Sequence, residues 1–238
     1  MKVAVLGSSG LIGGKLLNLL VRLDQVVRIY CPVRSIPAEN PKKVDFEQVN
    51  FENLGNPETE DSRKLLAGFL GCQAVVCCLG TTKKIAGSKA AQEKVDTRLP
   101  LTLAAIAKKA GVKNFLCVSA MGADSHSPFF YNRLKGMLED GLTMLNFETL
   151  TIVRPSLLLG KHRDKRLGED LMQKFFGGWR SMLVPSFFRP VFAETVAAHL
   201  ATSILRPPVD HICVTDGVKG KRIIYNRVLA KTKVDQLF

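Results

Sequence analysis

The sequence predicts an α/β protein with a doubly wound parallel sheet, and two observations support this fold class. Short apolar runs typical of buried strands alternate with segments in which apolar residues recur every three or four positions, as in helices. The alternation begins at the N-terminus and continues to about residue 156. Strand–helix alternation on this scale is typical of a parallel sheet covered by helices on both faces, with right-handed crossovers.

The first part of the chain contains three predicted strands and two predicted helices. Residues 3–7 (VAVLG) form an apolar run that predicts a buried strand, and residues 11–23 follow with helical apolar spacing. Residues 26–31 (VVRIYC) are rich in β-formers and predict the second strand. Residues 44–51 alternate between apolar and polar side chains, which predicts the third strand, and 62–70 predict a helix.

The middle of the chain continues the same pattern. Residues 74–80 (AVVCCLG) and 114–120 (NFLCVSA) are apolar runs that predict the fourth and fifth strands. Between them, residues 88–110 predict one helix that ends at an Ala-Gly pair, because glycine commonly follows the last helical residue. Residues 131–145 then predict a helix, and 150–156 predict the sixth strand.

After Pro155 the alternation becomes less regular. Residues 160–190 are rich in Gly, Phe and basic side chains and predict no clear element. Residues 194–205 predict a helix and 211–215 (HICVT) a late strand. The tail from Lys221 onwards predicts a basic amphipathic helix.

The composition indicates a folded protein in a reducing compartment. The chain has 238 residues, of which 46% are hydrophobic, and no run reaches the roughly 18 uninterrupted apolar residues that a membrane span needs. None of the six cysteines forms a C-x-x-C pair, and the four histidines lack ligand spacing, so we expect no metal site and no disulfide. Buried reduced thiols favour a cytoplasmic protein.

The net charge of +13 allows two interpretations. It can attract an anionic molecule such as a phosphorylated cofactor, or it can simply keep a basic surface in solution. The basic residues are spread along the chain, and no zinc finger, RNA-binding signature or helix-turn-helix accompanies them. We therefore expect no nucleic-acid partner.

A glycine-rich turn, GSSGLIG, joins the first predicted strand to the first predicted helix. In a dinucleotide site, Gly7 permits a tight turn, Gly10 lets the backbone approach a pyrophosphate, and Gly13 lets the helix pack close to the strand. The helix N-terminus supplies free N–H groups and the positive end of its dipole. The predicted cofactor contacts of this turn are Gly7, Ser9, Gly10, Leu11, Ile12 and Gly13.

The end of the second strand bears on which dinucleotide is bound. An NAD site usually places Asp or Glu about 20 residues after the glycines, to bind the ribose hydroxyls. Here residues 29–34 read IYCPVR and contain no acid. The guanidinium of Arg34 suits a 2′-phosphate through paired charge-assisted hydrogen bonds. We therefore predict NADP(H), with NAD(H) as the less favoured alternative.

Tyr131 and Lys135 form a Tyr-x-x-x-Lys motif on the helix after the fifth strand. Ligands of doubly wound sheets bind beyond the carboxyl ends of the strands, so Ser119 at the end of the fifth strand points at the cofactor crevice. A nearby ammonium lowers the pKa of a tyrosine, and such a tyrosine exchanges a proton with a carbonyl or alcohol oxygen during hydride transfer. Ser119 can hold that oxygen. The alternative is an ordinary surface pair on an amphipathic helix.

Together these features resemble the short-chain dehydrogenase/reductase superfamily in its extended or atypical branch, which has a Rossmann fold. Further motifs resemble the Tat-interacting-protein oxidoreductase-like group within it. These motifs follow one another in order within roughly residues 1–205, and they are CCLGTT (77–82), VD (95–96), S-x-x-GAD (119–124), Tyr-x-x-x-Lys-Gly (131–136), RPSLLLG (154–160), R-x-GE (166–169) and KFFGG (174–178).

The resemblance implies further cofactor contacts. Leu79 and Gly80 should line the cofactor edge of the fourth strand, Leu158 should approach the nicotinamide, and Arg166 should reach a cofactor phosphate. The chain departs from the family pattern at two points. Only Arg34 remains of an arginine pair after the second strand, and CLGTT contains no counterpart of the catalytic asparagine.

Two functions stay open from the sequence. The first is an NADP(H)-dependent oxidoreductase acting on an unknown carbonyl or alcohol. The second is an NADP(H)-binding regulatory protein with little or no turnover, because members of the resembled group are also described in this way. We expect a monomer or homodimer with one NAD(P)-binding domain over 1–238, in which 156–192 and 206–238 form substrate-pocket and C-terminal elements. Peripheral membrane contact of 175–192 and the basic tail is a third, less favoured interpretation.

Overall fold

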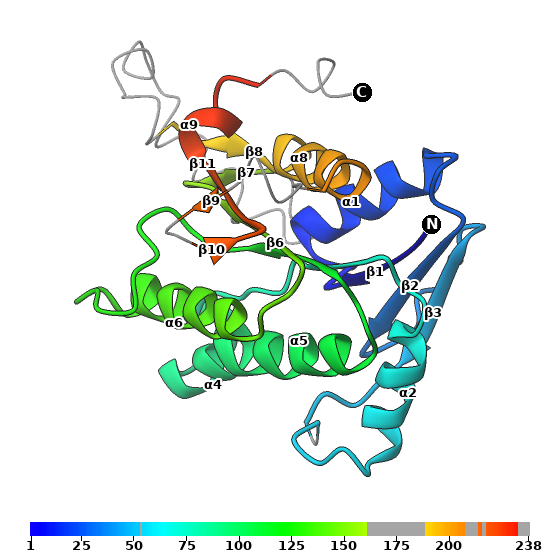
Figure 1. Ribbon diagram of the computed structural model, residues 1–238. Helices are drawn as coiled ribbons and strands as arrows, with labels where there is room; N and C mark the ends of the chain where they lie inside the picture. The colour runs from blue at the N-terminus through cyan, green and yellow to red at the C-terminus, as the bar shows by residue number, and fades with distance from the viewer. Residues whose placement is uncertain (53, 161–188, 208–213, 216–217, 233–238) are drawn as a thin grey trace.

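The computed structural model describes residues 1–52, 54–160, 189–207, 214–215 and 218–232. Its centre is a seven-stranded sheet of order β11-β6-β5-β4-β1-β2-β3 (Figure 1). Every neighbouring pair in this sheet is parallel, which confirms the predicted fold class. The strands are β1 (Lys2–Leu6), β2 (Arg28–Val33), β3 (Val44–Gln48), β4 (Ala74–Cys77), β5 (Asn114–Val118), β6 (Thr149–Arg154) and β11 (Lys221–Tyr225).

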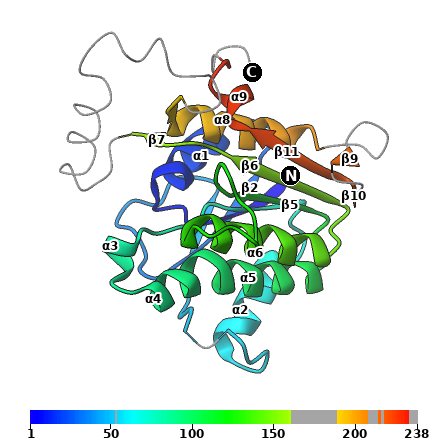
Figure 2. The same ribbon diagram turned by 90° about the vertical axis from the view of Figure 1, so that its left-hand side faces the viewer.

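Helices cover both faces of the sheet (Figures 1 and 2). One face carries α1 (Leu11–Arg22) and α8 (Ala193–Leu205), and the other carries α2 (Glu60–Phe69), α5 (Leu99–Lys109) and α6 (Phe130–Met144). The remaining short elements are α3 (Lys83–Ala86), α4 (Lys89–Glu93), α9 (Asn226–Leu229), the parallel pair β7 (Leu158–Leu159) and β8 (Val191–Phe192), and the antiparallel pair β9 (Val214–Thr215) and β10 (Val218–Lys219).

The strands read as continuous apolar runs because both of their faces are buried. Phe115 in β5 packs with the α2, α5 and α6 layer, whereas its neighbour Leu116 packs with the α1 and α8 layer. Both side chains have no exposed surface. Burying a side chain of this size contributes about 1.5–3 kcal/mol, so alternate residues stabilise opposite layers of the same sheet.

The helix predicted over 88–110 is interrupted in the structure. It starts as α4, passes through a π-helical turn at Lys94–Arg98 and continues as α5. Pro100 lies at the start of α5 and has no N–H, so it cannot bond to the carbonyl four residues earlier, that of Asp96. Such π turns often occur at functional sites. Here the turn carries Asp96, which has no exposed surface.

The prediction of a helix from Lys221 onwards is wrong for the start of this tail, and residues 233–238 lie outside the described residues. Residues Lys221–Tyr225 form β11, which pairs in parallel with β6 along its whole length. Ile223 and Ile224 pack on opposite faces of the sheet, which is possible for consecutive residues in a strand but not in a helix. Gly220, with φ of +70°, permits the turn that leads into the strand. Helix α9 follows directly.

Two further elements differ from the sequence predictions. Of the late strand predicted at 211–215, only Val214–Thr215 falls within the described residues, and it pairs with β10 outside the main sheet. The second strand runs to Val33, beyond its predicted end, and therefore includes Pro32. Proline is tolerated there because the described register of β2 with β1 ends at Tyr30.

Candidate functional site

The predicted glycine turn has the geometry that a close backbone approach requires. Gly7 adopts φ of +80°, a left-handed conformation that favours glycine. The Gly10 N–H donates to the Gly7 carbonyl at 3.0 Å. A Cβ at Gly13 would lie 2.1 Å from that same carbonyl oxygen, so only glycine fits there. No side chain caps the start of α1, so no capping side chain satisfies its first N–H groups.

Replacing Gly13 with Ala is expected to weaken both folding and dinucleotide binding. The added methyl group meets backbone atoms, and overpacking of this kind costs about 1–3 kcal/mol of unfolding free energy. Gly14→Ala is a matched control, because its Cβ would lie at an ordinary 3.5 Å from the Ser8 carbonyl. Urea denaturation and fluorescence titration with NADPH measure the two effects. Equal behaviour of the two variants would contradict this account of the turn.

The structure brings Tyr131 and Lys135 together on the first two turns of α6, as their spacing predicts. The Lys135 Nζ lies 6.0 Å from the centre of the Tyr131 ring and 3.9 Å from Asp96 Oδ1. Lys135 is buried, with 2% of its surface exposed. Asp96 Oδ1 accepts a hydrogen bond from the Thr81 N–H at 2.8 Å, and Asp96 Oδ2 has no hydrogen-bond partner among the described residues.

The net shift of the Tyr131 pKa is upward, which corrects the expectation of a lowered pKa. Withdrawal of the phenol from water raises this pKa by more than the Lys135 ammonium lowers it, and Asp96 raises it further. Burial lowers the pKa of Lys135, but the charges of Tyr131 and Asp96 act in the opposite direction and its net shift is upward. At neutral pH the phenol is therefore neutral and the ammonium is charged.

The hydroxyl of Ser119 belongs to a buried network. It donates to Glu139 Oε1 at 2.5 Å, and Glu139 also accepts from the Arg154 guanidinium at 2.5 and 2.9 Å. Ser119 and Glu139 are each 3% exposed. Ala120 and Met121, instead of Ser119, line the adjacent cavity at this strand end. The predicted role of Ser119 as a contact for the substrate oxygen thus has no support from the position of its side chain.

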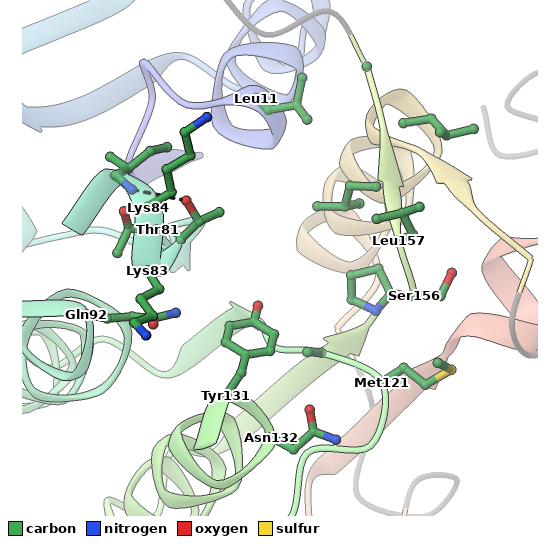
Figure 3. A pocket seen from close by; sticks show the side chains of 17 residues that line it. Leu11, Thr81, Lys83, Lys84, Gln92, Met121, Tyr131, Asn132, Ser156 and Leu157 are labelled. Atoms are coloured by element: carbon green, nitrogen blue, oxygen red, sulfur yellow. Dashed lines mark hydrogen bonds between the residues drawn. The ribbon is translucent and has the colours of Figure 1, made fainter. Parts of the chain in front are cut away.

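A cavity of about 740 Å³ lies beyond the carboxyl ends of β4, β5 and β6 (Figure 3). The segments after these three strands form most of its wall, and Tyr131 opens onto it from α6. The wall combines an apolar stretch after β6 with polar side chains after β4. Its lining residues are Leu11, Thr81, Thr82, Lys83, Lys84, Ile85, Gln92, Ala120, Met121, Tyr131, Asn132, Pro155, Ser156, Leu157, Leu158, Leu159 and Gly160.

Arg34 lies apart from this cavity, just after β2. Its side chain is exposed and borders a second cavity of about 590 Å³, which Gln48, Asn50, Asp61 and Lys64 also line. The Gln48 amide donates to the Arg34 carbonyl at 3.2 Å, which links the ends of β2 and β3. Two basic side chains, Arg34 and Lys64, therefore face one cavity at the position where a dinucleotide site usually holds the adenosine ribose.

The remaining predicted contacts lie on two sides of the glycine turn. Leu79 reaches the turn, since its Cδ2 would lie 3.2 Å from a Cβ at Gly7. A Cβ at Gly80 would lie 3.5 Å from Asp96 Oδ1 and 4.0 Å from Lys135 Nζ, both ordinary contact distances, so Gly80 lies beside this buried pair. Leu158, in β7, lines the large cavity. Arg166 lies outside the described residues, as does most of the predicted pocket segment 156–192.

Two residues of the site were missed by the sequence predictions. Asp96 lies against Lys135, and its signal was the VD pair at 95–96 together with Pro100 four residues later. Gln92 lines the large cavity from α4 and is 4% exposed. No pattern in the sequence distinguishes Gln92 from other polar helix residues.

Comparison with known proteins shows the family. The family described as NAD(P)H-binding matches residues 7–170, more than half of the chain. The chain belongs to this NAD(P)H-binding family. Within it, the chain is 32% identical over 208 residues to the protein HTATIP2 of Rattus norvegicus, covering 86% of this chain and 81% of that protein. It is 31% identical over 214 residues to FMP52, mitochondrial, of Debaryomyces hansenii, covering 86% and 89%.

Solved structures of similar shape agree on the fold. The oxidoreductase ylbE from Lactococcus lactis has a TM-score of 0.62 at 19% identity, covering 96% of this NAD(P)H-binding chain and 95% of its own. MoeE5 in complex with UDP-glucose and NAD has a TM-score of 0.65 at 12% identity, covering 94% and 75%. These likenesses confirm a Rossmann fold, and the relatives confirm the predicted resemblance to the Tat-interacting-protein group.

The same comparisons correct the predicted location. We expected a cytoplasmic protein, but several relatives, including those of Debaryomyces hansenii and Meyerozyma guilliermondii, are named mitochondrial. Buried reduced thiols, on which the expectation depended, do not distinguish between these compartments. Among the described residues, no helix has the length and apolar character that a membrane span requires, and no group of three or more His, Cys, Asp or Glu side chains is placed to bind a metal.

Proposed function

We propose that this NAD(P)H-binding protein is an NADP(H)-dependent oxidoreductase of the short-chain dehydrogenase/reductase type. It transfers hydride to or from a carbonyl or alcohol, with Tyr131 as the acid/base. The observation that carries this proposal is the Tyr131 phenol on the wall of the 740 Å³ cavity, with the charged Lys135 buried behind it. In this scheme Ser119 does not contact the substrate. Its hydrogen bond to Glu139, which also binds Arg154, helps to hold α6, the helix that carries Tyr131, against the ends of β5 and β6.

The glycine turn fits a dinucleotide cofactor. Its left-handed Gly7, the missing side chain at Gly13 and the uncapped start of α1 leave backbone N–H groups open to a pyrophosphate. The residues that would hold the cofactor are Gly7, Ser9, Gly10, Leu11, Ile12, Gly13, Arg34, Leu79, Gly80, Tyr131, Lys135 and Leu158.

In the proposed reaction, side chains of the protein transfer the proton and stabilise the charge that this transfer leaves. A bound nicotinamide supplies or accepts the hydride. During reduction Tyr131 donates its phenolic proton to the substrate oxygen, and during oxidation its phenolate takes that proton back. The Lys135 ammonium stabilises the phenolate. Asp96 balances the buried ammonium, and the Thr81 N–H fixes the orientation of the Asp96 carboxylate.

Replacing Arg34 with Ala is expected to reduce the preference for NADPH over NADH by roughly 10- to 100-fold. Hydrogen bonds to charged groups contribute about 1.5–3 kcal/mol each, and NADH has no phosphate that could lose such a contact. Fluorescence titration with both cofactors measures the ratio of dissociation constants. Arg28→Ala serves as the control, because Arg28 lies at the opposite end of β2, paired with Asp45. Equal weakening of both cofactors would contradict a 2′-phosphate contact.

A dinucleotide-binding regulator with little turnover is the second candidate. The bond between the Ser119 hydroxyl and Glu139 favours it, because Ala120 offers the cavity no hydroxyl at the end of β5. Single-turnover experiments distinguish the two functions. NADPH-loaded protein is mixed with a panel of aldehydes and ketones, and the loss of NADPH absorbance is followed. Oxidation of NADPH by any member of the panel supports the oxidoreductase, whereas tight NADPH binding without oxidation supports the regulator.

A further inference from the structure

Gln92 is a buried residue whose side-chain amide has no hydrogen-bond partner among the described residues. Gln92 is 4% exposed, lies in α4 and lines the same cavity as Tyr131. Its backbone N–H makes an ordinary helical bond to the Ser88 carbonyl. Within the described part of the chain, however, no group forms a hydrogen bond with the amide oxygen or nitrogen of its side chain. The amide contributes nothing to the internal hydrogen bonding of the protein.

Neither amide atom of Gln92 is among the fully buried polar atoms that lack a partner, so both keep contact with the open space of the cavity. A molecule that fills the cavity removes this amide from water, and a buried polar atom without a hydrogen bond costs free energy. The amide faces an open cavity, so a molecule bound in the cavity can supply the missing hydrogen bonds.

The side chains around the Gln92 amide indicate which chemical group of a ligand it binds. Figure 3 shows the head groups of Gln92 and Lys83 on the Tyr131 side of the cavity, whereas Lys84 extends towards Leu11 at the start of α1. Lys83 forms no ion pair with any carboxylate among the described residues. An ammonium and an amide N–H together match a carboxylate, which accepts several hydrogen bonds and carries the opposite charge.

The facing wall indicates the remainder of the molecule. Met121 and Leu157 present apolar side chains across the cavity from Gln92 (Figure 3), and the neighbouring Leu158 lines the same cavity. Apolar walls with a few placed polar groups are typical of sites in which the polar groups fix orientation and the apolar surface holds the body of the ligand. A charged group on this wall side would be left unpaired, so an uncharged hydrocarbon portion fits it better.

We propose that Gln92 and Lys83 select a substrate that carries a carboxylate near its reacting carbon and an apolar chain beyond it. The reacting pair is thus an oxo acid and the corresponding hydroxy acid. The carboxylate binds Gln92 and Lys83, which presents the neighbouring oxygen to Tyr131, and the chain lies along Met121, Leu157 and Leu158. This inference rests on the proposed function for the reaction, but the recognition of the carboxylate is a binding property that does not depend on turnover.

Calorimetric titration of the NADPH-loaded protein tests the proposal without any reaction. The probes are 2-hydroxyhexanoate and 2-hexanol, which differ in the carboxylate and cannot be oxidised by a reduced cofactor. Wild-type protein is expected to bind the hydroxy acid roughly 10- to 100-fold more tightly than the alcohol, as hydrogen bonds to a charged group allow. Equal affinities for the two probes would overturn the proposal.

Three variants assign the preference to the named side chains. Gln92→Leu keeps the size but removes the amide, and Gln92→Glu replaces the donors with a repelling carboxylate. Both are expected to lower the acid-to-alcohol ratio by about tenfold or more, and Lys83→Met should also lower it. Lys89→Met is the control, because Lys89 lies on α4 outside the cavity lining and over the Phe130 ring. A ratio that stays unchanged in both Gln92 variants would overturn the assignment.

The design separates this inference from the oxidoreductase proposal. If the protein oxidises no NADPH but the acid-to-alcohol ratio behaves as described, the reaction is wrong and the carboxylate site stands. If NADPH is oxidised by simple ketones and oxo acids at equal kcat/KM, and Gln92→Leu changes neither, the reaction stands and the carboxylate site is wrong. Thermal unfolding of each variant, with and without NADPH, verifies that a lost preference does not come from unfolding.

Discussion

Replacing Tyr131 with Phe is expected to lower kcat/KM for carbonyl reduction by about 10²–10⁴-fold, the range that a positioned acid or base contributes. The change removes one oxygen atom and leaves the ring against the cavity wall. NADPH binding should weaken far less than kcat/KM, because the glycine turn precedes α1, away from α6, and the Tyr131 ring stays in place. Stopped-flow measurement of NADPH oxidation, together with a separate NADPH titration, distinguishes lost chemistry from lost binding.

Tyr225→Phe provides the matched control for this variant. It removes the same phenol oxygen from a residue of similar exposure, 39% against 41% for Tyr131. Tyr225 lies at the end of β11, outside the lining of the large cavity. Its activity should equal that of wild type. A loss of equal size in both variants would show that the phenol of Tyr131 has no special role.

The pH dependence follows from the raised pKa of Tyr131. Reduction uses the protonated phenol, so its rate stays level through neutral pH and falls as pH rises through that raised pKa. Oxidation uses the phenolate, so its rate increases over the same alkaline range. Lys135→Met removes the ammonium that opposes the shift, and should move both transitions to still higher pH. A transition at acidic pH would assign the proton to another group.

The sheet was predictable wherever local pattern and tertiary burial agree. The run 114–120 is apolar because Phe115 and Leu116 face two different helix layers, so the pattern and the structure have one cause. The prediction for the tail from Lys221 was wrong because there the local pattern does not determine the structure. Ile223 and Ile224 are compatible with a helix or a strand, and the pairing of Lys221 with Leu150 in a distant segment decides between them. Local spacing carries no information about that partner.

The features of the site were likewise predictable where they follow from local spacing, and not where they depend on tertiary contacts. The spacing of Tyr131 and Lys135 specified their contact, and Glu139 continues the stripe four residues later, so a signal for it was present. The direction of the Tyr131 pKa shift was not readable, because it depends on how far the phenol is withdrawn from water. The engagement of Ser119 was missed because it requires a carboxylate from α6 to turn towards the end of β5.

Replacing Arg154 with Met is expected to lower the free energy of unfolding by about 3–5 kcal/mol, the usual effect of removing one partner from a buried ion pair. The Arg154 guanidinium donates to both carboxylate oxygens of Glu139, which is 3% exposed. Without it, Glu139 keeps the hydrogen bond from Ser119 but has lost the charge that compensated its own. Denaturation in urea, with a constant slope verified in each variant, measures the change.

Two comparisons identify the cause of this loss. Arg28→Met breaks an exposed pair with Asp45, and an exposed pair contributes at most about 1 kcal/mol. The double change Arg154→Met with Glu139→Leu removes the buried carboxylate together with its partly exposed partner, and we expect it to be more stable than Arg154→Met alone because no carboxylate is left uncompensated. If the double variant is instead no more stable, the loss comes from the packing of the arginine side chain. The charges of the network around Ser119 then contribute little to the free energy of unfolding.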